Sequence, residues 1–69
     1  MTLRITINGE ERRLEASLTV DALLSQLGLE RGMIAVERNL EIVPRSLYGE
    51  IRVADGDRLE IVQFIGGGM

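Results

Sequence analysis

Three consecutive glycines near the C-terminus, Gly66, Gly67 and Gly68, are the residues with the clearest chemical potential in this 69-residue chain. Glycine has no side chain and the widest range of backbone conformations, so such a run cannot pack into a core. We therefore expect residues 66–69 to form a flexible tail that can enter a channel too narrow for any Cβ atom. An inert frayed end is the alternative, but the run directly follows a predicted strand, which would place a flexible carboxyl end on a rigid platform.

The remaining side chains offer little for catalysis. The chain has no cysteine and no histidine, so it lacks a thiolate nucleophile, the commonest general base and the commonest neutral metal ligand. Ser46 and Tyr48 have no histidine to activate them. Asp55 and Asp57 flank Gly56, but two carboxylates without further ligands make a weak metal site, and a turn is the better interpretation. We predict no metal site and no enzymatic activity of the chain's own.

The charge balance argues against a nucleic-acid partner. Eleven acidic residues face eight basic ones, all of them arginine, which gives a net charge of −3. Neutralising phosphates needs a basic face, and Tyr48 and Phe64 are too few aromatic residues for a base-stacking platform. No apolar run approaches the roughly 20 residues of a membrane span, and the N-terminus lacks a signal-peptide pattern. We therefore expect a cytoplasmic protein without a membrane partner.

The first third of the chain predicts a hairpin. Apolar and polar residues alternate over 3–8, which is typical of a strand with one buried face. Asn8-Gly9 follows, the strongest short hairpin signal, because both residues tolerate positive φ. One face of the second strand is predicted to carry Arg12, Leu14 and Ala16.

A single helix is predicted over residues 20–27. Thr19 is a plausible N-cap, and Asp21 lies in the first turn, where the helix dipole favours an anion. Gly28 suits the left-handed position that ends a helix. The apolar stripe of this helix, which must cover the sheet, consists of Val20, Leu23, Leu24 and Leu27.

The middle of the chain predicts short pieces. Residues 33–36 are continuously apolar, which suggests a strand buried on both faces, and residues 37–39 suggest a turn. An extended piece over 40–43 should end at Pro44, which cannot donate to a ladder. A turn or helical loop is then expected at residues 46–49, and another extended segment around residues 51 and 53.

The last strand, predicted over 58–65, carries a second functional clue. Leu59 and Ile61 should face the helix, which places Val62 and Phe64 on the opposite face, next to the tail. That face is at least partly wet in a sheet with one helix, so apolar residues there suggest a docking patch for partner proteins. The alternative, that Val62 and Phe64 pack under residues 40–48, stays open on the sequence alone.

The order of these elements predicts an α+β fold. A hairpin, one crossing helix and a late strand suggest a mixed sheet of about four to five strands with one main helix packed across it. That is the β-grasp, or ubiquitin-like, architecture, in which the first and last strands are parallel neighbours at the centre. Residues 1–65 would form the domain and residues 66–69 the tail.

The sequence resembles the ThiS family of thiamine-biosynthesis sulfur carriers over its whole length. The resemblance rests on the order and spacing of five short segments, which are fairly specific in so short a chain. The segments that carry the resemblance are Asn8-Gly9, Thr19-Val20, residues 42–45 (Ile-Val-Pro-Arg), Asp55-Gly56-Asp57 and Gly67-Gly68.

The resemblance implies that the chain is a protein co-substrate. An E1-like adenylyltransferase of the ThiF type would use ATP and magnesium to adenylate the C-terminal carboxylate of Gly68. A persulfide, supplied through a sulfur donor such as a cysteine desulfurase, would displace AMP and leave a thiocarboxylate. Thiazole synthase, of the ThiG type, would take that sulfur. Gly66 to Gly68 would enter the partner active sites, and the chain itself would bind no cofactor.

Met69 departs from the family pattern, which usually ends at the two glycines. As written, the wrong residue carries the free carboxylate: either Met69 is trimmed, or it is an added residue, or this chain cannot be activated as it stands. We favour trimming or a gene-encoded extension. Two alternatives remain. The first is a sulfur carrier of the same architecture that serves another pathway, such as the small subunit of molybdopterin synthase. The second is a non-catalytic β-grasp binding module with an inert end. The length and the Val-Pro-Arg-Ser segment favour the thiamine branch.

Overall fold

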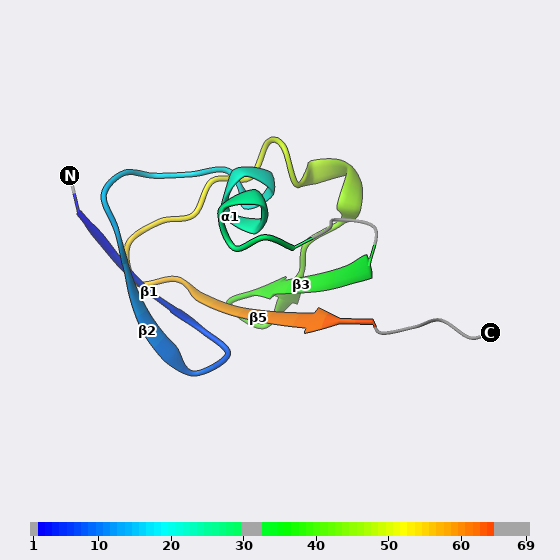
Figure 1. The fold of residues 1–69 in the computed structure, drawn as a ribbon, viewed down its shortest axis with the longest axis horizontal. Coiled ribbons are helices and arrows are strands. Elements are labelled where there is room, and N and C mark those ends of the chain that lie inside the picture. Colours follow the sequence, from blue (N-terminus) through cyan, green and yellow to red (C-terminus); the bar gives the residue numbers. More distant parts are fainter. Residues whose placement is uncertain (1, 30–32, 65–69) are drawn as a thin grey trace.

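A computed structural model describes residues 2–29 and 33–64 of the chain (Figure 1). It shows a five-stranded sheet with one short helix, α1, lying across one face, so the predicted α+β architecture is confirmed. The elements are, in chain order, β1 (Leu3–Ile7), β2 (Glu10–Leu14), α1 (Val20–Gln26), β3 (Ile34–Arg38), β4 (Glu41–Ile42), a 3₁₀ turn (Arg45–Leu47) and β5 (Arg58–Gln63).

The last strand lies at the centre of the sheet. The strand order is β2-β1-β5-β3-β4. As predicted, β1 and β5 are parallel neighbours, with Ile7 opposite Leu59, whereas every other pair is antiparallel. The strand that precedes the tail is therefore flanked by strands on both sides and is not an edge of the sheet.

The hairpin between β1 and β2 forms around the predicted Asn8-Gly9 turn. Both residues have positive φ, 52° and 85°, the conformation that a two-residue hairpin loop requires. The second strand begins at Glu10 and ends at Leu14, which is buried. The prediction that Ala16 belongs to this strand is therefore wrong, since the chain leaves the sheet to reach the helix.

The helix is held at both ends. The Thr19 hydroxyl oxygen accepts a hydrogen bond from the Ala22 backbone N–H at 3.1 Å, as expected for an N-cap. Two further N–H groups of the first turn donate to the loop that follows the 3₁₀ turn, Val20 to the Ile51 carbonyl and Asp21 to the Tyr48 carbonyl. A seven-residue helix is marginal alone, so these anchors and its buried stripe stabilise it.

Gly28 ends the helix in the predicted left-handed conformation, with φ 76°. Its N–H donates to the Ser25 carbonyl, and the Leu29 N–H donates to the Leu24 carbonyl, which is the Schellman pattern. Leu29 is thereby turned back against the core, where it is partly buried.

The sheet has one covered face, which corrects the prediction for β3. Ile34 and Val36 are buried, whereas Ala35 between them is only partly buried, and Met33 is 39% exposed. A single helix covers only one side of the sheet, so the apolar run is not buried on both faces. The strand also continues through Arg38, and the turn that was expected at residues 37–39 falls at residues 39–40, both with positive φ.

The segment between β4 and β5 fills the core mainly without strands. The helical loop is confirmed as the 3₁₀ turn, but the extended segment around residues 51 and 53 is reduced to one bridge, between Arg52 and Thr19. Three residues of this segment, Val43, Tyr48 and Val53, are nevertheless buried. No helix within residues 2–29 and 33–64 has the length and apolarity to cross a membrane.

Candidate functional site

The end of β5 is the part of the fold that leads into the glycine tail. On one side, β3 pairs with β5 through Gln63, and the Phe64 N–H donates to the Met33 carbonyl at 2.7 Å. On the other side, the Asn8 N–H donates to the Leu59 carbonyl at 2.9 Å. Ile65, the three predicted tail glycines and Met69 lie outside the described residues, as does the proposed boundary at residue 65.

The Asp55-Gly56-Asp57 turn starts this strand, as predicted, and its carboxylates have structural partners. Asp55 Oδ1 accepts from the Arg4 N–H at 2.7 Å. Gly56, with φ 88°, donates its N–H to the Arg4 carbonyl at 2.7 Å. These contacts fasten the turn to the neighbouring strand β1.

Asp57 is the only buried charged residue among those the structure describes. One carboxylate oxygen accepts from the Ala54 N–H at 2.7 Å and from Arg38 Nε at 2.8 Å, and the other accepts from Asn39 Nδ2 at 3.0 Å. Burial alone would raise the pKa of Asp57. The hydrogen bonds from Ala54, Arg38 and Asn39 and the charge of Arg38 outweigh that effect and hold the pKa below its ordinary value.

The predicted alternation along β5 is confirmed. Leu59 and Ile61 are buried beneath the helix, whereas Val62 and Phe64 are 55% and 51% exposed on the opposite face. Val62 and Phe64 therefore do not pack beneath residues 40–48, and the alternative of a covered face is ruled out for these two side chains.

Two further apolar side chains join them, Leu40 at 84% and Ile42 at 66% exposure. Ile42 lies opposite Glu37 in the β3–β4 pair, and Val62 lies opposite Ala35 in the β3–β5 pair, so these side chains share one face of the sheet. We call Leu40, Ile42, Val62 and Phe64 the open-face patch. A hollow of about 430 Å³ on this face is lined by Ala35, Glu37, Leu40, Ile42, Glu60 and Val62.

Two carboxylates border the open-face patch. Glu37 and Glu60 are directly opposite each other in the β3–β5 pair, and neither belongs to an ion pair within the described part of the chain. Like charges in this position destabilise a sheet. Arg58 is exposed on the same face and lines a neighbouring hollow with Leu40 and Glu60, so the border carries two carboxylates and one guanidinium. An apolar centre with this net acidic border suits a partner surface that is apolar and bordered by arginine or lysine.

Comparisons with known proteins place the chain in context. The model of the ThiS family matches residues 5–68. The sulfur carrier protein ThiS of Bacillus subtilis is 37% identical over 65 residues, which cover 93% of this chain and 98% of that protein. The crystal structure of the thiamine biosynthesis protein ThiS from Geobacter metallireducens is 35% identical, with a TM-score of 0.82 over 96% of this chain and all of that one.

A second kind of relative is longer. Thiazole synthase of Paramagnetospirillum magneticum is 61% identical over 66 residues, which cover 96% of this chain but 20% of that protein, so the chain spans about a fifth of this relative. The family match extends over nearly the whole chain and agrees with the similarity to a carrier of the same size and to a solved fold. The chain therefore belongs to the ThiS family.

Proposed function

We propose that the chain is a sulfur carrier protein of thiamine biosynthesis. The observation that carries the proposal is the match of residues 5–68 to the ThiS family, which includes Gly67 and Gly68. Similarity to sulfur carrier proteins named ThiS in Bacillus subtilis and Escherichia coli, over almost their full lengths, supports the thiamine branch over a molybdopterin-synthase subunit.

The proposed chemistry takes place on the Gly68 carboxylate. A carboxylate is a poor electrophile, so an adenylyltransferase first transfers AMP from ATP to it, with magnesium and loss of pyrophosphate. A persulfide supplied through a cysteine desulfurase then attacks the acyl carbon and displaces AMP, which gives an acyl disulfide. A thiol then attacks the donor-side sulfur of that S–S bond, forms a disulfide with the donor cysteine and releases the thiocarboxylate on Gly68. The chain supplies only the carboxylate and the glycines that carry it, because these have no Cβ atoms to obstruct a narrow channel.

Thiazole synthase is the proposed acceptor of the sulfur. In the relatives from Paramagnetospirillum magneticum and Magnetococcus marinus, a segment similar to this chain is part of a protein named thiazole synthase. A covalent link keeps a carrier at high effective concentration beside the enzyme that uses it. That arrangement supports a direct encounter between this chain and a thiazole synthase.

The open-face patch is the proposed docking surface for the adenylyltransferase. Its four apolar side chains are all at least half exposed, and two of them, Val62 and Phe64, lie at the strand end that leads into the tail. We expect Phe64→Ala to weaken binding to the adenylyltransferase at least about tenfold, since central aromatic side chains carry much of the energy of an interface. Gln26→Ala, on the exposed side of α1, is the matched control. Unchanged affinity of the Phe64 variant would exclude the open-face patch as the docking surface for the adenylyltransferase.

Mass spectrometry tests the carrier function itself. A chain ending at Gly68 is incubated with the adenylyltransferase, ATP, magnesium, a persulfide donor and a thiol reductant, and the expected product has one oxygen replaced by sulfur. The same reaction on the chain that retains Met69 should give no thiocarboxylate, because Gly68 then lacks a free carboxylate. A binding module with an inert end would give neither adenylate nor thiocarboxylate. Protein from the native host should end at Gly68, and Met69 on every molecule would contradict the proposal.

A further inference from the structure

The two sides of β5 are unequal near its end. Backbone groups of even-numbered residues point toward β3, as the bond from the Phe64 N–H to the Met33 carbonyl shows. Groups of odd-numbered residues point toward β1, as the bond from the Asn8 N–H to the Leu59 carbonyl shows. β3 pairs with β5 up to its last residue, Gln63, whereas β1 ends at Ile7, opposite Leu59.

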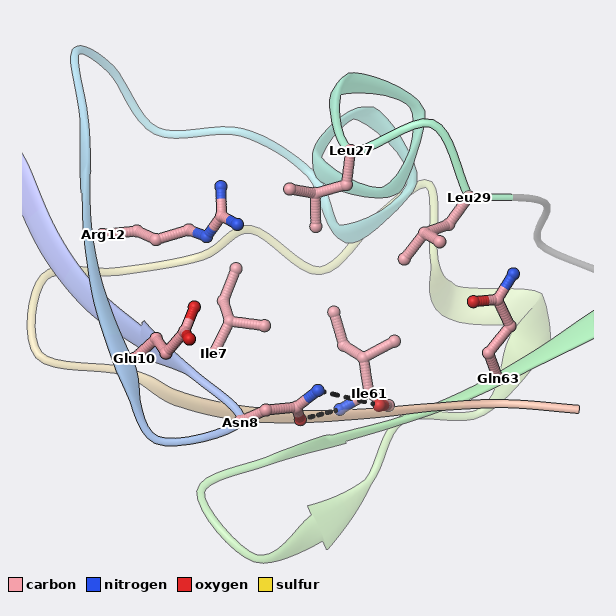
Figure 2. Close-up of a pocket in the computed structure, with 8 residues that line it drawn as sticks. All are labelled: Ile7, Asn8, Glu10, Arg12, Leu27, Leu29, Ile61 and Gln63. Atoms are coloured by element: carbon pink, nitrogen blue, oxygen red, sulfur yellow. Dashed lines mark hydrogen bonds between the residues drawn. The ribbon is translucent and has the colours of Figure 1, made fainter.

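The side chain of Asn8 replaces the strand that β1 no longer provides. Its Oδ1 accepts from the Ile61 N–H at 2.8 Å, and its Nδ2 donates to the Ile61 carbonyl at 3.1 Å (Figure 2). The next odd-numbered residue is Gln63, whose N–H and carbonyl point the same way. Within residues 2–29 and 33–64, no strand lies on that side of Gln63. The last described backbone groups on this side are therefore an open strand edge.

An apolar groove lies against this open edge, on the helix side of the sheet. Ile7 and Ile61 point up from the sheet, while Leu27 and Leu29 point down toward them from the end of the helix (Figure 2). The groove has a volume of about 370 Å³, and its remaining lining residues are Asn8, Glu10, Arg12 and Gln63. Leu29, positioned by the Schellman turn at the end of α1, and Gln63 both line this groove (Figure 2), so the groove and the strand edge form one surface.

We propose that an extended segment of thiazole synthase adds to the sheet at Gln63. The segment hydrogen-bonds to the Gln63 backbone, continuing the line of β1 beyond Asn8, and inserts an apolar side chain between Leu29 and Ile61. This is strand addition, in which backbone bonds give affinity and a side-chain pocket gives specificity.

The position of the edge favours an enzyme that holds the tail as the occupant. Gln63 precedes Gly68 by five residues, and an extended chain of five residues spans at most roughly 17 Å. Any enzyme that receives Gly68 must therefore reach close to this edge. The inference rests on the proposed function, and thiazole synthase is chosen because relatives unite the two in one chain.

Amide hydrogen exchange, followed by NMR on the full chain, tests the pairing directly. In the free protein the Gln63 amide should exchange fast, while the Val62 amide, which points toward β3, should be protected. Binding of thiazole synthase should slow exchange at Gln63 at least about tenfold. Unchanged exchange at Gln63 in the complex would overturn the proposal. Protection by the adenylyltransferase alone, and not by thiazole synthase, would overturn the choice of occupant.

A pair of substitutions tests the backbone contribution. Gln63→Pro removes an N–H that the β3 ladder does not use, and Gln63→Ala changes only the side chain. We expect the proline variant to bind thiazole synthase about tenfold more weakly than the alanine variant, the effect of one lost hydrogen bond. Both variants lack the Gln63 side chain, which lines the groove, so the comparison isolates the backbone N–H. Equal affinities of the two variants would contradict strand addition. Thiocarboxylate formation is measured on both, so failure of the carrier function is seen separately from failure of this contact.

Discussion

Asp57→Asn tests how the central strand is held at its start. The carboxylate accepts from the Ala54 N–H at 2.7 Å, from Arg38 Nε at 2.8 Å and from Asn39 Nδ2 at 3.0 Å. Asparagine has the same size but replaces one acceptor oxygen with an NH₂ group, which faces a donor whichever way the amide is turned. At least one donor therefore loses its partner, and Arg38 loses the opposite charge.

The expected loss of unfolding free energy is about 2–4 kcal/mol at pH 7, because a hydrogen bond to a charged group contributes about 1.5–3 kcal/mol and a buried group without a partner costs about 1–3 kcal/mol. A small domain has only about 5–15 kcal/mol in total, so the effect should be large in urea denaturation followed by circular dichroism. Asp55→Asn is the matched control in the same turn. Its exposed carboxylate accepts one N–H, from Arg4, which an amide oxygen can also accept, so its loss should stay below about 1 kcal/mol.

The wild type and the Asp57→Asn variant should respond differently to pH. The pKa of Asp57 is lowered in the folded protein, so its contribution is fully present above the ordinary pKa of about 3.9. That contribution is lost as the pH falls through the lowered pKa of the folded state. The amide that replaces the carboxylate does not titrate, so the stability gap to the wild type should narrow below about pH 3.9. An equal gap at neutral pH and well below the ordinary pKa, or no gap at neutral pH, would refute the assignment of the carboxylate network.

Three further substitutions test other parts of the fold. Gly28→Ala should cost about 1–2 kcal/mol in urea denaturation, because an alanine with φ 76° is strained; no loss would mean that the helix end rearranges freely. Glu60→Gln should stabilise the free protein by about 0.2–1 kcal/mol by removing the repulsion of Glu37, and a stability that falls would contradict that repulsion. Asn8→Gly keeps the positive φ but removes both bonds to Ile61, so the Ile61 amide should exchange faster; unchanged exchange would show that the side chain does not hold the strand.

The locally determined features of the fold were predicted well. Asn8-Gly9 specifies the hairpin and Thr19 and Gly28 specify the ends of the helix, because each works through its own backbone conformation or a partner a few residues away. The apolar run at residues 33–36 led to the wrong prediction of a strand buried on both faces, since a run of apolar residues does not reveal whether a second layer covers the sheet. Tyr48 was expected in a loop, and its burial depends on how that loop crosses the core.

The candidate site likewise has a part that the sequence predicted and a part that it did not. The exposure of Val62 and Phe64 follows from the period of two along β5, so the sequence predicted it. Leu40 and Ile42 were missed as members of the open-face patch, because their place depends on the register of β4 against β3. The hydrogen bonds of the Asn8 side chain to Ile61 join residues 53 positions apart, and no local sequence pattern predicts such a contact.

The end of β5 presents different chemistry on its two faces, and this bears on how one tail can serve two enzymes. The open-face patch lies on one side of the strand, and the groove with the Gln63 edge lies on the other. A single tail can occupy only one active site at a time, so the two enzymes compete for the glycines wherever they contact the folded domain. Separate surfaces on the body allow each enzyme to hold the carrier by contacts that the other does not use. The proposals therefore require that Phe64→Ala impair adenylation with little effect on binding to thiazole synthase. Gln63→Pro, in contrast, should weaken binding to thiazole synthase with little effect on adenylation. If both substitutions weakened both complexes equally, a single shared docking surface would account for the carrier.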